Sequence, residues 1–383
     1  MTEVSRPAQG GRARGEVFWV FLRIGALSFG GPAATMGLVH SKVVLGLKWI
    51  DKRDFLDLTG MVSVLPGPNA VEMAMHIGRR RAGRAGFVLG GVAFILPGAL
   101  LAAILGALYA RYGTTPAAAW LLYGIKPVVV AVTAWTVVRL AQSAKPRRPA
   151  RAVLMVVVAV AYVLGVDELL LLAAAGVLAL AARLRHTALP KKPGALMLPL
   201  AAPTGQSDLV SLAGVFLKAG ALLFGGGAVL LALLRGELVV DRGWITETEL
   251  LDAIAVGQVT PGPVLNTATF LGYTLGGPLG ALVVTVVVVL PSFALMAAAG
   301  PLLRVIRSRD WTRAALDGIT LGSIGVLAGV TVEFARTGIT DLLTVGLAAA
   351  AALTLWRRPQ SALVLVAAGA ALGLLRLLAH HLM

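Results

Sequence analysis

The chain of 383 residues has no cysteine, little charge and few acidic residues. Without cysteine it can form no disulfide, no thiol nucleophile and no cysteine metal site. Charged residues make up 14% of the chain, whereas an ordinary soluble domain carries about 25%. A chain so poor in charge cannot cover a folded surface with polar side chains. The composition therefore excludes a water-soluble domain of useful size.

Hydrophobic residues are abundant instead, at 58% of the chain. A membrane-spanning helix needs about 20 apolar residues, so the length allows roughly ten such helices. Lys and Arg number 34 against 18 Asp and Glu, which gives a net charge of +16. The cations lie mostly in short loops beside apolar runs, as in cytoplasmic loops. We therefore attribute the charge to membrane topology and lipid headgroups, and expect the lipid bilayer but no nucleic acid as a partner.

The sequence contains an internal repeat. The segment FGGPAATMG at 29–37 aligns with FGGGAVLLA at 224–232, so Phe29 pairs with Phe224 at an offset of 195 residues. The same offset aligns Trp49 with Trp244 and the Pro-Gly-Pro at 66–68 with the one at 261–263. After the removal of one residue, an offset of 194 aligns Pro97 with Pro291 and Gly124 with Gly318. Chance does not keep such a register, so the pattern predicts a duplication.

Each half has one segment interrupted by the Gly-rich motif, a second interrupted at Pro-Gly-Pro, and four smoother apolar runs. The periodicity predicts these runs at roughly 85–110, 117–140, 152–166 and 168–183, then 279–303, 314–332, 340–356 and 361–378. We divide the chain into a basic N-terminal tail at 1–16, a first transmembrane repeat at 17–185, a basic, Pro-rich linker at 186–208 and a second repeat at 209–383. In the tail we expect no cleaved signal peptide.

The basic loops predict opposite orientations of the halves. In the first half they are RRRAGR at 79–84, KPRRPAR at 145–151 and the linker. In the second half the mate of the first basic loop, 274–278, has no charge, whereas four arginines lie within 304–313. Basic loops face the cytoplasm. The expected fold is therefore an all-α polytopic membrane protein with two homologous inverted-topology halves. If both halves cross the membrane equally often and the linker is cytoplasmic, the N-terminus lies outside, whereas the basic tail predicts that it lies inside. Either one broken segment of the first half is re-entrant where its mate crosses, or the short tail is an exception to the rule that basic segments are cytoplasmic.

Consecutive glycines interrupt an apolar helix at matching places in the two halves. They are Gly30 and Gly31 in FGGP, and Gly225 and Gly226 in FGGG. A broken helix exposes backbone groups, which is tolerated in a membrane only inside the protein or along a wet cavity. Close packing of helices through glycine is the alternative explanation. Because a second break recurs in both halves, we favour substrate-binding roles for these glycines.

The second break is LPGPN at 65–69 and TPGPV at 260–264. A helix that begins after Pro-Gly-Pro directs free backbone N–H groups and its positive dipole end into the protein, which suits an anion. Asn69 and Asn266 follow the two breaks and can donate amide hydrogen bonds to a substrate, although they occupy different repeat positions. Helix capping or hydrogen bonding between helices remains the alternative.

Ionisable residues inside apolar runs are candidates for function because they are costly there. Lys126 lies within GIKPVVVAV, and Arg23 and Lys218 are repeat mates, each six residues before a Phe-Gly-Gly motif. We assign these three cations to substrate binding, with snorkelling to the interface as the alternative. Glu72 and His76 lie four residues apart on one face of a helix. They are candidates for proton coupling, unless Glu72 merely pairs with a basic neighbour.

The carboxylates of WIDKRDFLD at 49–57 and WITETELLD at 244–252 have a structural explanation. Asp51 and Thr246 are suited to be helix N-caps, with Asp54 and Glu249 three residues later closing capping boxes. We therefore do not propose an acid/base pair here. The chain has no P-loop, helix-borne zinc motif or nucleophile elbow. We expect no enzyme activity, no catalytic residue, no cofactor and no resident metal, and transport would have to use ion gradients or the membrane potential.

These motifs carry a resemblance to a known family. FGGPAA at 29–34, LPGPNAVEMAMHIG with RRRAG at 65–83, GIKP at 124–127, FGGG at 224–227, DRGWIT at 241–246 and QVTPGPV at 258–264 resemble the chromate ion transporter family of the long, two-domain type. The resemblance covers nearly the whole chain. Thr35 stands where many relatives have histidine, which puts a role for that side chain in doubt.

The resemblance implies a secondary transporter that exports chromate, with sulfate as a related anion and coupling to protons. A tetrahedral dianion has only acceptors, so N–H donors and cations in a water-excluded site suit it. Sulfate has nearly the same shape and charge, and physics does not choose between them. An importer of sulfate or another oxyanion is the alternative, and a membrane-embedded lipid-modifying enzyme is a third hypothesis that lacks a catalytic cluster. We expect a multi-pass protein of the inner membrane, with a second copy in a homodimer as a further candidate partner.

Overall fold

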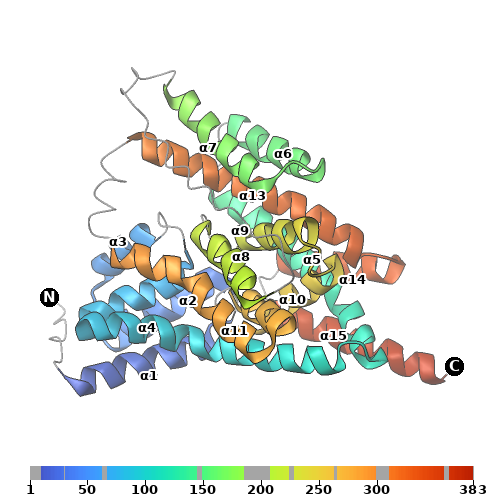
Figure 1. Cartoon of the computed structure of the whole chain (residues 1–383), viewed down its shortest axis with the longest axis horizontal. Helices are drawn as coiled ribbons and strands as arrows, with labels where there is room; N and C mark the ends of the chain where they lie inside the picture. Colours follow the sequence, from blue (N-terminus) through green and yellow to red (C-terminus); the bar gives the residue numbers. More distant parts are fainter. Residues whose placement is uncertain are drawn as a thin grey trace.

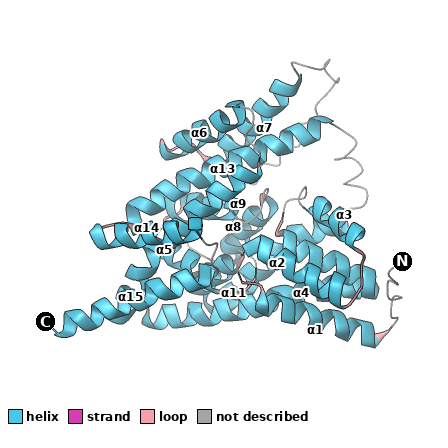
Figure 2. Cartoon of the chain, turned by 180° about the vertical axis from the view of Figure 1, so that it is seen from behind, coloured by secondary structure: helices cyan, strands magenta, loops and turns pink. Residues whose placement is uncertain are grey.

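The computed structural model describes residues 10–29, 31–62, 67–144, 149–184, 208–223, 228–262, 265–298, 310–357 and 362–382. Every regular element in these ranges is helical, and none is a strand (Figure 2). The helices of the first half are α1 (Gly11–Leu27), α2 (Gly31–Val39), the π-helix η1 (His40–Gly46), α3 (Lys52–Val62), α4 (Asn69–Tyr112), α5 (Pro116–Ser143), α6 (Pro149–Val163) and α7 (Glu168–Leu184).

The second half repeats this order of elements. Its helices are α8 (Leu209–Ala221), α9 (Ala228–Leu234), the π-helix η2 (Arg235–Asp241), α10 (Glu247–Val259), α11 (Asn266–Ala297), α13 (Asp310–Gly338), α14 (Leu342–Arg357) and α15 (Ala362–Leu382). The predicted apolar runs coincide with helices in both halves. The two π-helices were not expected from the sequence, and they too occupy matching places.

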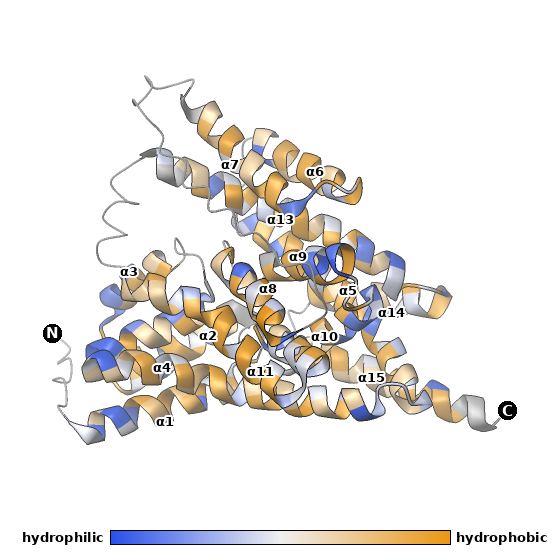
Figure 3. Cartoon of the chain, in the orientation of Figure 1, coloured by the Kyte–Doolittle hydropathy of each residue, from blue (hydrophilic) through white to orange (hydrophobic). Residues whose placement is uncertain are grey.

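The helices are hydrophobic along most of their length (Figure 3). Among the described residues four helices are long and apolar enough to cross a membrane: Asn69–Tyr112, Pro116–Ser143, Asn266–Ala297 and Ala314–Gly338. Five further apolar helices are shorter. By composition and length the chain is therefore a multi-pass membrane protein, as expected.

The helices α4 and α11 each consist of two arms joined by a sharp turn. Ala82 and Gly83 leave the helical conformation in α4, and Gly276 and Gly277 leave it in α11. The φ angles of Gly83 and Gly277 are 64° and 61°, a region that glycine enters without strain. Gly78 packs against the backbone of Gly86, which is possible only if the arms fold back on each other. The first basic loop is thus mostly helical and contains this turn.

The first arms of these two hairpins are too short to cross a membrane. Residues 69–81 and 266–275 precede the turns. At 1.5 Å per residue they extend about 20 and 15 Å, against about 30 Å for the hydrocarbon core of a bilayer. The second arms, 84–112 and 278–297, are long enough to cross.

The two halves interlock. In each half the first helix packs on the second arm of the hairpin, so that Gly25 of α1 meets the Phe94 carbonyl and Gly220 of α8 meets the Val288 carbonyl. The last two helices of each half instead pack on the other half: α6 and α7 on α13, and α14 and α15 on α5 (Figure 1). Each half therefore covers a long helix of its mate, α5 in the first half and α13 in the second.

Candidate functional site

Four helix breaks that are distant in the sequence meet inside the molecule. The backbone N–H of Gly67, between α3 and α4, donates to the carbonyl of Leu223, which follows α8, at 3.0 Å. Reciprocally, the N–H of Gly262, between α10 and α11, donates to the carbonyl of Ser28, which follows α1, at 2.9 Å. Both hydrogen bonds connect one half to the other. They hold the start of each hairpin against the end of the first helix of the opposite half.

The hairpins α4 and α11 also touch each other at these breaks. Gly98, next to Pro97 of α4, lies against the Pro261 carbonyl and the side chain of Asn266. At the matching place Ser292 of α11 lies against Gly67. A Cβ atom at Gly98 or at Gly67 would collide with these neighbours. Glycine therefore allows the first turn of each hairpin to sit against the middle of the other.

Of the predicted glycines, Gly31 is the first residue of α2. Gly30, Gly225 and Gly226 lie outside the described residues. The described residues that precede the two motifs are buried: Ser28 is 2% exposed and Leu223 is fully buried. Each Gly-rich motif is thus preceded by a buried residue whose carbonyl accepts a hydrogen bond from the opposite half.

Both predicted asparagines use their amides within the breaks. Asn266 is 1% exposed, and its Nδ2 donates to Thr260 Oγ1 at 3.0 Å and to the Pro261 carbonyl at 2.9 Å. With its amide turned to satisfy its surroundings, Asn69 donates to the carbonyls of Gly67 and Val62 at 3.3 and 3.2 Å. This geometry corresponds to the alternative explanation, in which the amides stabilise the chain where the helices restart.

Lys126, on α5, is paired with a carboxylate from the other half. Its Nζ lies 3.4 Å from Oδ1 of Asp252 on α10. The Asp252 side chain is 3% exposed and that of Lys126 is 18% exposed. Tyr109 of α4 donates its hydroxyl to Oδ2 of Asp252 at 2.9 Å. Asp252 is eight residues before Thr260, so this cluster lies about 12 Å along the helix axis from the second break.

The mates Arg23 and Lys218 have different surroundings. Arg23 is exposed, and the described part of the chain offers it no ion pair. Lys218 donates to the buried carboxylate of Glu237 in η2, and Arg242 Nε lies 3.4 Å from the other oxygen of Glu237. Snorkelling remains open for Arg23, whereas Lys218 is held inside the protein by a carboxylate that the sequence did not single out.

Glu72 is fully buried in the first turn of α4. Neither of its carboxylate oxygens has a hydrogen-bond partner among the described residues, and the adjacent hydroxyl of Ser292 has none either. The expected alternative, an ion pair with a basic neighbour, is not found in the described structure. His76 is half-buried one turn later, with Arg79 and Arg80 nearby. An unpartnered carboxyl group thus faces the meeting of the breaks.

A further cation, Arg235, was missed by the sequence analysis. It begins η2, and its Nη2 lies 2.6 Å from Oε1 of Glu247 and 3.8 Å from Oε2 of Glu333. Its Nη1 donates to the hydroxyl of Tyr162 at 3.2 Å. The four side chains come from η2, α10, α13 and α6, and so connect both halves. Nothing in the local sequence marks Arg235, because its partners lie 12 to 98 residues away.

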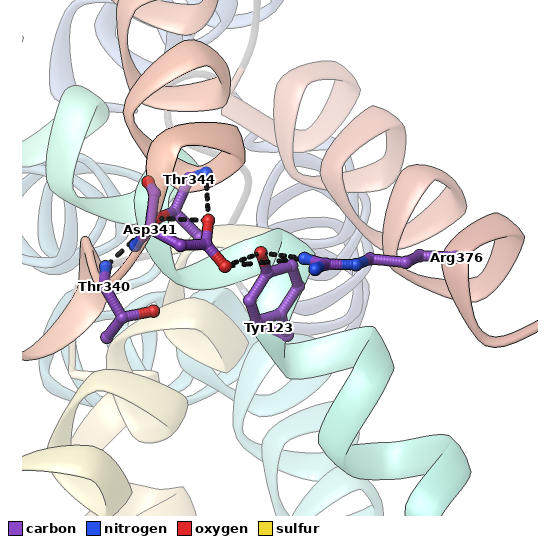
Figure 4. Close-up of polar contacts among 5 residues, drawn as sticks. All are labelled: Tyr123, Thr340, Asp341, Thr344 and Arg376. Atoms are coloured by element: carbon purple, nitrogen blue, oxygen red, sulfur yellow. Dashed lines mark hydrogen bonds and ion pairs between the residues drawn. The ribbon is translucent and has the colours of Figure 1, made fainter. Parts of the chain in front are cut away.

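A polar cluster in the N-terminal part of α5 lies one turn from Lys126. The hydroxyl of Tyr123 donates to Asp341, and Arg376 of α15 donates to the same hydroxyl (Figure 4). Asp341 also caps α14, because its Oδ1 accepts from the N–H of Thr344 at 2.9 Å. The hydrogen bond from Tyr123 lowers the pKa of Asp341 to about 2. The cluster joins the terminal helix of the second half to the first half.

The sequence profile of the chromate transporter family matches residues 15–180 and again residues 210–374. The double match confirms the duplication. A chromate transport protein of Pseudomonas aeruginosa is 33% identical over 94% of this chain and 91% of its own length. One of Cupriavidus metallidurans is 32% identical over 94% of this chain and 93% of its own length. A probable chromate transport protein of Synechococcus elongatus is 28% identical, with coverages of 91% and 92%.

No solved structure matches the chain. The relatives are named as transport proteins, in agreement with the expectation that the chain is not an enzyme. Both halves match, and the relatives are covered over almost their entire length. The chain belongs to the chromate transporter family.

Proposed function

We propose that this chain is a secondary transporter that carries chromate, an oxyanion with two negative charges, out of the cytoplasm. The observation that supports this most is the reciprocal pair of hydrogen bonds from Gly67 to Leu223 and from Gly262 to Ser28. They hold the start of each hairpin against the end of the first helix of the other half, and Gly98 of one hairpin lies against Asn266 at the start of the other. Relatives that match almost the whole chain are named chromate transport proteins.

The chemistry of that place suits an anion. The first turn of a helix has free N–H groups and the positive end of the helix dipole, and transporters direct such ends at anionic substrates. Glycines at 30, 31, 225 and 226 would let backbone N–H groups approach the substrate closely. Lys126 and Lys218 would supply positive charge from the neighbouring helices. The amides of Asn69 and Asn266 would act indirectly, by fixing the helix starts.

We further propose that the repeats at 17–185 and 209–383 are inserted in opposite orientations in the inner membrane, with the substrate between them. The short hairpin arms 69–81 and 266–275 would then be re-entrant. In the cysteine-free chain, single cysteines within 79–84 and 274–278 can be labelled with an impermeant thiol reagent. The proposal expects labelling from opposite sides of the membrane, and labelling of both from one side contradicts it.

The direction of transport follows from charge. Each elementary charge that crosses 100 mV contributes about 2.3 kcal/mol, so a dianion that leaves a negative-inside cell gains roughly 4.6 kcal/mol. At about 1.4 kcal/mol per factor of ten, this supports a gradient of more than a thousandfold without ATP. Import would have to work against the same free energy. Export is therefore the easier task for a chain without a nucleotide motif.

Proton coupling is assigned to Glu72, with His76 one turn away. A fully buried carboxyl group without a hydrogen-bond partner costs less when it is protonated, so it can exchange a proton when the breaks open to water. Glu72→Gln should leave transport of the anion possible but change its dependence on the pH gradient. An unaltered pH dependence would restrict Glu72 to a structural role.

The test of the proposed function is flux in proteoliposomes with pH and potential set independently. Vesicles that hold labelled chromate should lose it faster when their interior is made negative, and cells that carry the protein should accumulate less chromate. Labelled sulfate serves as the comparison. Faster uptake of sulfate and greater accumulation of chromate in cells would favour the importer instead, and no flux of either anion would contradict the proposal.

A further inference from the structure

The carboxylate of Asp252 occupies the position next to Lys126 that a bound anion would need. One of its oxygens, Oδ2, accepts from Tyr109 at 2.9 Å. The other, Oδ1, faces Lys126 Nζ at 3.4 Å and accepts no hydrogen bond within the described structure. A charge-assisted hydrogen bond is typically about 2.7–2.9 Å long, so this pair is loose. This buried oxygen is thus held by a long ion pair to Lys126 and by no hydrogen bond of normal length.

The groups around Asp252 come from four helices. Lys126 of α5 and Tyr109 of α4 contact it directly. Glu249, one turn earlier on α10, is half-buried and closes the capping box with Thr246. The ring of Phe270 on α11 packs edge-on against Tyr109 at 5.2 Å. Lys126 is therefore the cation next to Asp252, and Glu249 the further acid, among the described residues.

The repeat mate of Asp252 provides a built-in contrast. At the offset of 195 the mate is Asp57, in the same position of the same motif. Asp57 is exposed on α3, whereas Asp252 is 2% exposed. A capping motif explains neither carboxylate, because the caps are Asp51, which accepts from the Asp54 N–H, and Thr246. The burial of Asp252 therefore needs an explanation of its own.

We propose that Asp252 is the internal counterion of Lys126. When an oxyanion binds, it takes the place of Asp252 as the counterion, and Asp252 takes up one proton. This inference rests on the proposed function. Ionised, Asp252 neutralises Lys126 and repels a dianion. Protonated at Oδ1, it no longer neutralises the lysine, and its hydroxyl becomes a donor. Lys126 and the Asp252 hydroxyl can then both donate to an oxyanion, which has only acceptors.

A consequence is that anion affinity and proton affinity are linked. When binding takes up one proton, the affinity for the anion rises about tenfold for each unit by which the pH falls, between the titration points of the free and the occupied site. Because the proton and the anion are bound at the same time, they would cross the membrane together. One chromate would then move one negative charge instead of two.

The test is equilibrium binding to the purified, folded protein, with chromate and sulfate as probes at pH values at which both are dianions. Calorimetry in two buffers of different ionisation enthalpy counts the protons taken up per anion and requires no variant. We expect about one proton per anion and the corresponding tenfold slope. At these pH values Asp252→Asn should bind the anion more tightly than the wild type and lose the slope. Asp57→Asn, the matched control, should keep the slope.

Each outcome has a distinct meaning. Binding to the wild type without proton uptake overturns the role of Asp252 and leaves the proposed function intact. The role of Asp252 is also overturned if Asp252→Asn keeps the wild-type dependence of anion affinity on pH. Loss of that dependence in Glu72→Gln would then assign the proton to Glu72. If the folded wild type binds neither anion, the proposed function itself fails. Should Asp252→Asn not fold, the proton count of Glu72→Gln decides: an unchanged count supports Asp252, and a lost count overturns its role.

Discussion

In the first half the fourth residue after the Pro-Gly-Pro break is Glu72, whereas the matching residue of the second half is Thr267. Conversely, the buried Glu237 of the second half corresponds to Lys42, which is exposed in η1. The two halves thus share their breaks, turns and π-helices and differ in where they place buried charge. The repeated backbone forms a common scaffold, and the chemistry has diverged within it. The buried carboxylates Asp252 and Glu237 of the second half each lie beside a cation, whereas the buried Glu72 of the first half has no partner among the described residues.

The largest loss of anion binding and thermal stability is expected when Lys126 is replaced; its repeat mate is Thr320. Removal of one partner of a buried ion pair leaves an uncompensated charge, which costs about 3–5 kcal/mol. Lys126→Ala should therefore lose anion binding and also lower the thermal stability of the purified protein. Asp252→Ala in the same chain should restore most of the stability but not the binding. Thr320→Ala is the matched control, with little change expected. Equal instability of the single and the double variant would contradict the pairing.

The shared scaffold is tested by glycines that meet a backbone carbonyl. In Gly25→Ala and Gly220→Ala a methyl group would collide with the carbonyls of Phe94 and Val288. Overpacking of this kind costs about 1–3 kcal/mol, and both halves should suffer alike in a thermal unfolding measurement. Gly214→Ala, on the same helix as Gly220 but with open space around it, should be tolerated. A strongly unequal loss in the two halves would break the equivalence of the scaffold.

The mates Arg23 and Lys218 sharpen the comparison of charges. Lys218→Ala removes a hydrogen bond to the buried Glu237, which should cost roughly 1.5 kcal/mol; Arg242 remains close enough to limit the loss. Arg23→Ala removes an exposed side chain, so a change within about 0.5 kcal/mol is expected. Unfolding of the two variants in the same detergent provides the measurement. Equal losses would show that Arg23 has a buried role as well.

The smallest effect concerns the cluster of Tyr123, Asp341 and Arg376, which the first half does not repeat. The mates of Tyr123 and Arg376 are Asp317 and Ala182. Because the folded protein holds the pKa of Asp341 at about 2, below its ordinary 3.8, this carboxylate stabilises the fold above pH 4 and loses that effect as the pH falls towards 2. Asp341→Asn should flatten the stability between pH 4 and 2. An unchanged acid profile would contradict the lowered pKa.

The sequence predicts the helices and the duplication well because both leave periodic traces. The eight predicted apolar runs coincide with the second arms of α4 and α11 and with α5, α6, α7, α13, α14 and α15, and their ends differ from the helix ends by up to six residues. Partnerships between distant segments leave no such trace. Asp252 lies in the same motif as the exposed Asp57, and only the packing of α10 against α5 separates the two. Glu237 and Arg235 were missed because both lie in η2, a π-helix that local periodicity does not reveal, and their partners come from other helices.

The interlocked packing of α7 on α13 and of α15 on α5 also bears on how the polypeptide could be divided. A cut between residues 185 and 208 would leave two fragments, each with its longest straight helix stripped of the helices that cover it. The close approaches at these contacts, such as Gly124 against Gly369 and Gly318 against Ala175, are of the kind that associates helices within a bilayer. Two fragments made together should therefore assemble, whereas either one made alone would present an uncovered helix face to lipid. We therefore expect the two fragments to assemble without a peptide bond between them, provided that both are made at the same time.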